Sequence, residues 1–457
     1  MSTKELSLAA AGAAGPLYVE DVFSTYLYTG NGGSQTITNG IDLAGKGGMV
    51  WLKDRKISGT GHDIYDTVRG VNSGYLTASA TLQQVGASYG LTAFNSDGFY
   101  LGSGFDANNS GDPSVSWTFR KAPNFFDVVT WTGDGNSTKT IPHSLGSTPG
   151  FIIAKCTNYA GTQWYCYHRS LGTGQYVALN LTDAAASGTV FPSVGSSSFS
   201  VGGYYNGSGS TNVAYLFADN AGGFGADGSQ SIISCGSYTT NSSGNATVNL
   251  GWEPQYVLAK VINTSGFQWG IFDTMRGMSY NNYAMLQAQS SGAEVTSPNG
   301  NIIPTATGFY DNGQSNGSNT TVIYIAIRRP MKTPTSGSQV FSPNAVSSAG
   351  YVTTGFPLDM QILAPRNADM GSSVYFQTVY DRLRGSYGSA GGFWGIGTSS
   401  TSTEAQMNQS MSWDNNTGFK AAIGGYNQVF WNFKRAPGFF DVVCYAGTGS
   451  AQTLNHN

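Results

Sequence analysis

The chain repeats itself at the spacing of one small domain. The segment WTFRKAPNFFDVV at residues 117–129 returns 314 residues later as WNFKRAPGFFDVV at residues 431–443. Two weaker copies lie between them and begin at Tyr215 and Tyr324, so the 314 residues contain three spacings of about 105 residues. Repetition at a fixed period indicates tandem copies of one structural unit. We therefore expect a multi-contact structural or adhesive protein rather than an enzyme with a single site.

Composition restricts the kind of unit. The 457 residues include 63 glycines, aromatic residues make up 13%, and charged residues only 10%. Short strands joined by glycine-rich and asparagine-rich turns have this composition, whereas helices need more Glu and Lys. We predict an all-β protein of tandem antiparallel β-sandwich domains, jelly-roll or lectin-like, of about 105 residues each. The 40% of hydrophobic residues argue against disorder.

The charge and hydropathy pattern excludes two classes of partner. The formal net charge is −3, so the chain lacks the basic surface that binds nucleic acid. No run approaches the roughly 18 apolar residues that a membrane helix needs. We predict neither nucleic-acid binding nor membrane insertion.

A common order of elements recurs in each unit. An apolar strand, expected at residues 49–53, 151–155, 256–260 and 360–363, precedes a strand in which aromatic residues alternate with others. Alternation bounded by turns is typical of a half-buried strand, so the two strands predict a hairpin in every unit. The unit closes with the strand that begins at Trp117, Tyr215, Tyr324 or Trp431.

This order divides the chain into segments. We expect unit 1 at residues 17–123, unit 2 at 124–223, unit 3 at 224–333 and unit 4 at 334–437. Residues 1–16, with a short helix over residues 3–11, form an N-terminal attachment segment. Residues 438–457 begin an incomplete fifth unit, which further residues or another subunit would complete. The linkers are too short to flex freely, so we expect neighbouring units to form a semi-rigid rod.

Two charged motifs repeat with the units. Asp-x-x-Arg-Gly occurs at residues 66–70, 273–277 and 381–385, while unit 2 has His168 at the same place. Lys53, Lys155 and Lys260 end the apolar strands of units 1 to 3. Each motif could bind a ligand, or the Asp could cap backbone amides while the Arg pairs locally. Repetition in tandem domains is what a fold requires, so we favour the structural interpretation for both motifs.

Motifs with catalytic potential lack their structural context. Residues 313–317 match G-x-S-x-G and residues 223–228 match G-x-G-x-x-G, but no helix is expected after either one. The four histidines have no carboxylate or cysteine at the spacing of a metal site or a catalytic triad. We predict no catalytic residue, no cofactor and no metal ion, and hence a protein that is not an enzyme.

Loops that combine tyrosine with asparagine and glycine are the better candidates for recognition. A tyrosine ring offers a flat apolar face beside adaptable hydrogen-bonding groups, which suits binding to sugars and proteins. Ordinary loop packing is the alternative interpretation. The candidate surface-recognition residues are Tyr204, Tyr205, Asn206, Tyr280, Tyr283 and Tyr426.

The ordered set of motifs resembles the repeated unit of tail-fibre and other virion structural proteins of tailed bacteriophages, particularly cyanophages. The set comprises Thr-Gly-Asn-Gly after an aromatic strand, Phe-Ile-Ile-Ala-Lys, Asp-x-x-Arg-Gly, Gly-Phe and Trp-x-Phe-Arg-Lys-Ala-Pro, and it covers nearly the whole chain after residue 16. The resemblance implies a virion component that forms homo-oligomers, with a trimer favoured, and that binds other virion proteins through its N-terminal segment. It transfers no catalytic residue.

Three functions are consistent with these observations. The first is a tail fibre or similar appendage on the extracellular virion, which contacts a glycan or protein of the host surface. The second is a decoration protein of the capsid or tail shell. The third is a secreted array of carbohydrate-binding modules. Symmetry and position on the virion would separate the first two, and sugar affinity of a single unit would identify the third.

Overall fold

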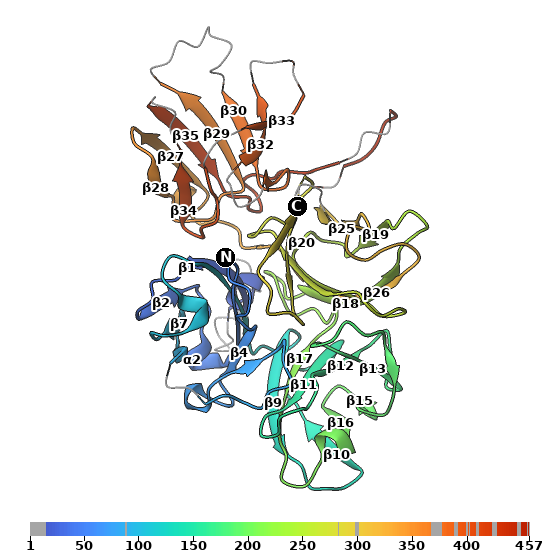
Figure 1. The fold of residues 1–457 in the computed structure, drawn as a ribbon. Coiled ribbons are helices and arrows are strands. Elements are labelled where there is room, and N and C mark those ends of the chain that lie inside the picture. The colour runs from blue at the N-terminus through green and yellow to red at the C-terminus, as the bar shows by residue number, and fades with distance from the viewer. Residues whose placement is uncertain are drawn as a thin grey trace, which may run out of the picture.

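A computed structural model describes residues 15–457, except 87–88, 282, 298–300, 367–376, 388–391, 399–400, 402, 408–410, 423–426, 446–448, 455 and 457. The fold is almost entirely β, with antiparallel sheets arranged as successive sandwich-like domains, which confirms the predicted fold class (Figure 1). The expected N-terminal helix over residues 3–11 lies outside the described residues.

Unit 1 pairs a five-stranded sheet with a three-stranded sheet. In spatial order, the large sheet contains β1 (Phe23–Thr29), β8 (Pro113–Arg120), β3 (Gly48–Asp54), β4 (Asp63–Asp66) and β5 (Leu76–Thr77). The small sheet contains β2 (Gln35–Thr38), β7 (Gly98–Leu101) and β6 (Leu91–Asn95). The connections contain short helical turns, which are η1 (Val19–Asp21), α2 (Leu43–Lys46), η2 (Val71–Ser73) and η3 (Asp106–Asn108).

Unit 2 has a six-stranded sheet and a three-stranded sheet. The large sheet contains β9 (Phe126–Thr132), β17 (Thr211–Phe217), β11 (Phe151–Cys156), β12 (Tyr165–His168), β13 (Gln175–Ala178) and β14 (Ala186–Ser187). The small sheet contains β10 (Thr138–Pro142), β16 (Ser198–Gly202) and β15 (Ser193–Val194), and η4 (Gly203–Tyr205) follows β16.

Units 3 and 4 repeat the arrangement. The large sheet of unit 3 contains β18 (Ile233–Thr239), β26 (Thr321–Arg328), β20 (Pro254–Val261), β21 (Trp269–Asp273), β22 (Tyr283–Gln287) and β23 (Val295–Ser297), and its small sheet contains β19 (Ala246–Asn249), β25 (Gly308–Asp311) and β24 (Ile302–Thr305). Unit 4 follows η5 (Gly337–Gln339). Its large sheet contains β27 (Phe341–Val346), β35 (Gln428–Phe433), β29 (Met360–Pro365), β30 (Thr378–Asp381), β32 (Gly392–Gly397), β31 (Ser386–Tyr387) and β33 (Ala405–Met407), and β28 (Gly350–Thr353) pairs with β34 (Gly418–Ala421).

The first four strands of each large sheet have the same order in all four units. The opening strand lies beside the closing strand, then the apolar strand, then the aromatic strand, as in β1-β8-β3-β4 and β9-β17-β11-β12. The predicted hairpins are confirmed, because β3 pairs with β4, β11 with β12, β20 with β21 and β29 with β30. In unit 4, β27 takes the place of the opening strand, although its sequence matches the other units poorly.

In units 1 to 3, the apolar strands β3, β11 and β20 are buried on both faces. Successive side chains of a strand point to opposite faces of the sheet. In β3, Val50 and Leu52 belong to the core between the two sheets of unit 1, whereas Met49 and Trp51 belong to a second core outside that sandwich. In β20, Val257 likewise belongs to the core of unit 3, whereas Tyr256 belongs to this second core. An antiparallel sheet commonly leaves one face in water, so here another part of the chain must cover it.

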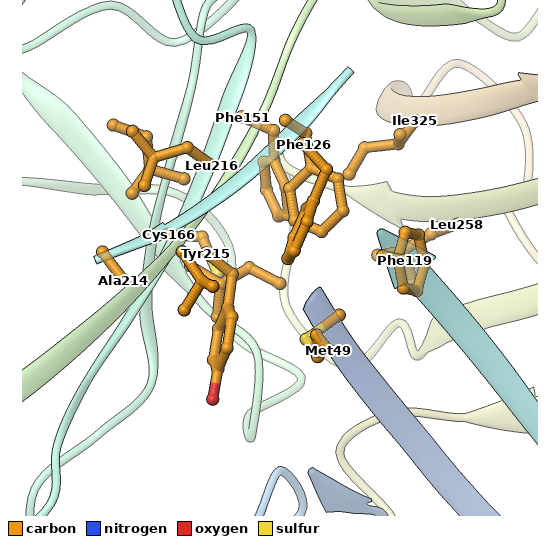
Figure 2. Packing of buried hydrophobic residues seen from close by; sticks show 14 of the residues in the cluster. Met49, Phe119, Phe126, Phe151, Cys166, Ala214, Tyr215, Leu216, Leu258 and Ile325 are labelled. Atoms are coloured by element: carbon orange, nitrogen blue, oxygen red, sulfur yellow. The ribbon is translucent and has the colours of Figure 1, made fainter. Parts of the chain in front are cut away.

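The second core joins the first three units. Phe119 of unit 1 has its ring centroid 5.5 Å from Phe217 of unit 2 and 6.2 Å from Tyr256 of unit 3. Figure 2 shows Phe119 and Met49 facing Phe126 and Phe151 of unit 2, with Leu258 of unit 3 alongside. Each unit thereby covers the outer sheet faces of the other two.

The expected rod is therefore wrong for units 1 to 3. Unit 3 contacts unit 1 as well as unit 2, because Gly59 N donates to Ser291 O at 2.8 Å and Glu294 N donates to Arg55 O at 2.8 Å. The three units thus form a closed ring (Figure 1). Unit 4, orange to red in Figure 1, lies beside the ring and contacts units 1 and 3. Short linkers limit flexing, but they do not determine whether sheet faces meet in a line or around a centre.

We expect Phe119→Ala to lower the free energy of unfolding by about 3–5 kcal/mol, since it removes a fully buried aromatic ring from the shared core. Chemical denaturation followed by tryptophan fluorescence measures this loss. Tyr351→Ala, at a side chain that is mostly exposed, is the control and should change stability by less than about 0.5 kcal/mol. Equal effects of the two substitutions would contradict the shared core.

Candidate functional site

The repeated Asp-x-x-Arg-Gly turn is held by its own two charged side chains. In unit 3, Asp273 Oδ1 accepts a hydrogen bond from Arg276 N at 2.9 Å, and its Oδ2 accepts from Arg276 Nε at 2.6 Å. The remaining end of the guanidinium reaches the strand itself, where Nη2 donates to Ile271 O at 2.9 Å. Both side chains are fully buried. The structural interpretation of the motif is confirmed for this turn.

The turns of units 1 and 4 have the same geometry. Arg69 Nε lies 2.6 Å from Asp66 Oδ2, and Arg384 Nε lies 2.5 Å from Asp381 Oδ2. In unit 1 the Arg69 Nη2 group also donates to Ile64 O at 2.9 Å. One short segment therefore builds the same capped turn three times.

The same turn also connects one unit to the next, which sequence analysis did not predict. Tyr215 of unit 2 donates its hydroxyl to Asp66 Oδ2 of unit 1 at 2.9 Å. Trp117 of unit 1 donates its indole Nε1 to Asp273 Oδ2 of unit 3 at 3.1 Å, and the Arg276 guanidinium lies 5.1 Å from the Trp117 ring centroid. Trp117 and Tyr215 occupy matching positions of the closing strands, so the two contacts are equivalent.

His168 of unit 2 completes the cycle. It replaces the aspartate of the motif, and its Nε2 lies 3.2 Å from the carbonyl oxygen of Tyr324 in unit 3. Ser170 N donates to His168 Nδ1 at 3.1 Å, so Nε2 carries the proton and donates to that carbonyl. Unit 1 therefore holds unit 2, unit 2 holds unit 3 and unit 3 holds unit 1, always from the turn to the closing strand.

A second set of contacts runs around the ring at the loops. Trp164 of unit 2 donates Nε1 to Thr77 O of unit 1 at 3.1 Å, and Trp269 of unit 3 donates Nε1 to Ala178 O of unit 2 at 2.9 Å. His62 takes the matching position in unit 1, is fully buried, and accepts a hydrogen bond from Trp51 Nε1 at 2.9 Å. Burial lowers the pKa of His62 well below its usual value.

The repeated lysines fix a loop within their own units. Lys53, Lys155 and Lys260 have fully buried side chains, and each Nζ donates to a backbone carbonyl seven residues later, at 2.8, 2.5 and 2.7 Å. Burial lowers the pKa of each ammonium group to about 8. The structural interpretation is confirmed for the lysines too, because their charged ends are used inside the fold.

Two of the predicted recognition residues are buried. Tyr205 is fully buried and donates its hydroxyl to Ala154 O at 2.7 Å, while Asn206 is fully buried and donates to Asn136 O at 2.9 Å. Their prediction as surface-recognition residues is therefore wrong. They lie at the end of η4, whose tight turn directs Tyr205 into the core and leaves its neighbour Tyr204 outside.

Tyr204 belongs to an aromatic surface cluster. Its side chain is 43% exposed, and its ring centroid lies 4.6 Å from that of Tyr165, which in turn lies 4.5 Å from that of Tyr176. The Tyr204 hydroxyl accepts a hydrogen bond from Gln163 N at 2.8 Å, which fixes the ring. Burial and the two neighbouring hydroxyls raise the pKa of Tyr165. The loop composition that predicts recognition residues does not identify Tyr165 and Tyr176, because they belong to the strands β12 and β13.

The remaining candidates do not form one site with this cluster. Tyr280 in unit 3 is 59% exposed, and its backbone N donates to Leu383 O of unit 4 at 2.8 Å. Tyr283 in β22 is half-buried and packs against the core of unit 3. Tyr426 lies outside the described residues.

Neither a metal centre nor a membrane-spanning helix is found in the described part of the chain. It contains no group of three or more His, Cys, Asp or Glu side chains arranged to hold a metal ion. It also contains no helix of the length and apolarity that crossing a membrane requires.

Comparison with known proteins assigns the chain to a family. Residues 19–330 match the model of the family described as "Domain of unknown function (DUF7483)", and the chain therefore belongs to that family. The matched region coincides with units 1 to 3, and unit 4 lies beyond it. No curated protein matches the chain.

We expect Tyr215→Phe to lower the free energy of unfolding by about 1.5–3 kcal/mol, the range for a hydrogen bond to a charged group. The substitution keeps the ring in place and removes only the hydroxyl group, which donates a hydrogen bond to Asp66. The exposed Tyr89 provides the control substitution Tyr89→Phe. Urea denaturation measures both, and a Tyr215→Phe variant as stable as the control would exclude this contact as a connector of units 1 and 2.

We also expect His168 to make stability depend on pH. Burial lowers its pKa to about 4, against about 6.5 in an unfolded chain. Between these values the unfolded chain binds the extra proton, so stability falls as pH falls through this window. From pH 7 to pH 4.5 the natural chain should lose about 2–3 kcal/mol more than His168→Gln, whose amide can still donate to Tyr324 O.

Denaturant titrations at the two pH values measure this difference. His143→Gln is the matched control, because His143 also accepts from a backbone amide two residues later but is half exposed. It should retain the pH dependence of the natural chain. If His168→Gln does so as well, another group controls the acid sensitivity.

Proposed function

We propose that this chain is a non-enzymatic structural protein of a tailed-bacteriophage virion, carried as a tail fibre or similar appendage. The observation that supports a non-enzymatic structural role most strongly is the closed ring of three repeated units. The recurring charged side chains, among them Asp66, Asp273 and Lys155, are used to hold backbone and neighbouring units. A chain whose repeated polar residues hold the fold together in this way is suited to be a structural or adhesive protein. The order of the repeated motifs resembles that of phage virion proteins, which supports a bacteriophage origin.

The ring also suggests how the protein would attach. Three turn-to-strand contacts give units 1 to 3 an approximate threefold arrangement within a single chain. Two of them are made by the side chains of Tyr215 and Trp117, and the third by the carbonyl oxygen of Tyr324. Symmetric assemblies present the same surface at each symmetry-related position. We propose that the ring lies against other virion proteins, with the N-terminal segment as a further attachment and with homotrimers as the assembled form.

The compact ring favours a second candidate, a decoration protein of the capsid or tail shell. A rod would reach outward from the particle, whereas three units around one centre form a compact body that suits a surface lattice. The cluster of the half-buried Tyr165 and Tyr176 with the exposed Tyr204 is the observation that favours the third candidate, a secreted carbohydrate-binding array, because tyrosine faces stack on sugar rings.

Localisation on the particle tests the proposal. Fab fragments against unit 4 would be bound to particles of the phage that encodes the chain, and the complexes imaged by cryo-electron microscopy. We expect label on the tail. Label distributed over the head lattice would replace the appendage by the decoration protein. Particles without label, together with absence of the chain from their mass spectra, would overturn the virion assignment.

A further inference from the structure

Unit 4 has an apolar sheet face that the described chain covers only in part. In β35, burial alternates along the strand: Phe430 is buried in the core of unit 4, whereas Trp431 and Phe433, on the opposite face, are half-buried. In β8, the matching strand of unit 1, every residue of 114–119 is buried. The large sheet of unit 4 is therefore well covered on one side only, whereas the matching sheet of unit 1 is covered on both.

The partly covered face is the one that forms the ring core in unit 1. Trp51 of β3 lies opposite Trp117 of β8, and both belong to the core that the three ring units share. In unit 4, Ile362 of β29 lies opposite Trp431 of β35 in the same register. The two closing strands also begin the two copies of the strongest sequence repeat, 314 residues apart. We define the outer face of unit 4 by six half-buried residues, Met360, Ile362, Val379, Val429, Trp431 and Phe433.

The surroundings of the outer face are apolar and exposed as well. Phe125, which follows the closing strand of unit 1, is fully buried, with its ring centroid 6.4 Å from that of Phe119. Phe439 takes the matching place after unit 4 and is 44% exposed. Ile396, which lies opposite Val379 in the sheet, is 41% exposed. Contiguous apolar surface of this kind marks a site of protein contact.

Unit 4 contacts the ring through loops rather than through the outer face. Asn416 Oδ1 accepts a hydrogen bond from Leu27 N at 2.7 Å, and Arg435 Nη2 lies 2.8 Å from Glu253 Oε1. Neither Asn416 nor Arg435 belongs to a strand. Among the described residues, none of the six that define the outer face belongs to the ring core, and the strands of unit 4 project away from the ring in Figure 1.

The ring shows what covers such a face in this protein. Each large sheet of the ring is covered by two sheets of the same kind, and the contacts run head to tail, from the turn of one unit to the closing strand of the next. Head-to-tail contacts between identical copies close into a ring when the rotation allows it, and in units 1 to 3 they close after three. Unit 4 has both ends of such a contact, namely the capped turn of Asp381 and Arg384 and the closing-strand residue Trp431.

We propose that unit 4 is a trimerisation domain, in which the outer faces from three copies of this chain cover one another as units 1 to 3 do within one copy. Trp431 of each copy then lies in a core shared by the three chains, as Trp117 does in the ring. This inference names the surface of the homotrimer in the proposed function and rests on that part of it.

Sedimentation velocity of the full chain tests the surface. We expect a trimer that dissociates on dilution. Ile362→Lys should raise the concentration needed for assembly about tenfold or more, because each trimer would bury three unpaired ammonium groups. Tyr351→Lys is the matched control, because it adds the same charge to unit 4 at a side chain that is 69% exposed and belongs to β28, outside the large sheet. It should assemble as the natural chain does.

Trp431→Lys is the second variant and should impair assembly as Ile362→Lys does. Circular dichroism and the thermal transition of each variant establish that it is folded. The proposal is overturned if the natural chain stays monomeric, if it forms a dimer, or if Ile362→Lys and Tyr351→Lys assemble alike. A trimer that Ile362→Lys and Trp431→Lys leave intact would exclude this surface and retain the homotrimer, whereas the position of label on particles tests the virion assignment separately.

Discussion

The fold depends on the burial of both faces of the large sheets in units 1 to 3. Every residue of β3 and of β20 is buried, and alternate side chains enter two different cores. If one unit were separated, Trp51, Trp117 or Tyr256 would be exposed in an apolar patch of the kind that soluble domains rarely present. The three sandwiches are therefore parts of one body rather than independent domains, and the ring is the smallest arrangement in which all three outer faces are covered.

The sequence predicts the repeated parts better than their arrangement. Strand order within a unit follows from local patterns, so the hairpins and the capped Asp-x-x-Arg-Gly turns could be predicted. The uninterrupted apolar runs of β3 and β11 also indicate burial on both faces, but they do not say what covers the second face. The covering of the second face depends on contacts of Trp117 and Tyr215 with turns about 150 residues away. The sequence around either residue does not indicate which turn it contacts.

For the candidate recognition residues too, the sequence does not predict how the side chains are arranged. Tyr204 and Tyr205 are neighbours with the same composition of residues around them, yet one is exposed and the other is fully buried. The direction of each side chain is determined by the turn of η4 and by the carbonyl oxygen that Tyr205 reaches in β11. The cluster of Tyr165, Tyr176 and Tyr204 depends on three separate elements, so only the folded chain reveals it.

Ring closure between units 1 and 3 is the central claim, and a cross-link tests it most directly. Ala293 N donates to Ser58 Oγ at 3.3 Å, although 235 residues separate them. Cysteines introduced by Ser58→Cys and Ala293→Cys should be joined within one chain by a short bismaleimide, which peptide mapping of the monomer band would identify. A rod would place units 1 and 3 on opposite sides of unit 2. Absence of the intramolecular link in folded protein, or its appearance only between chains, would contradict the ring.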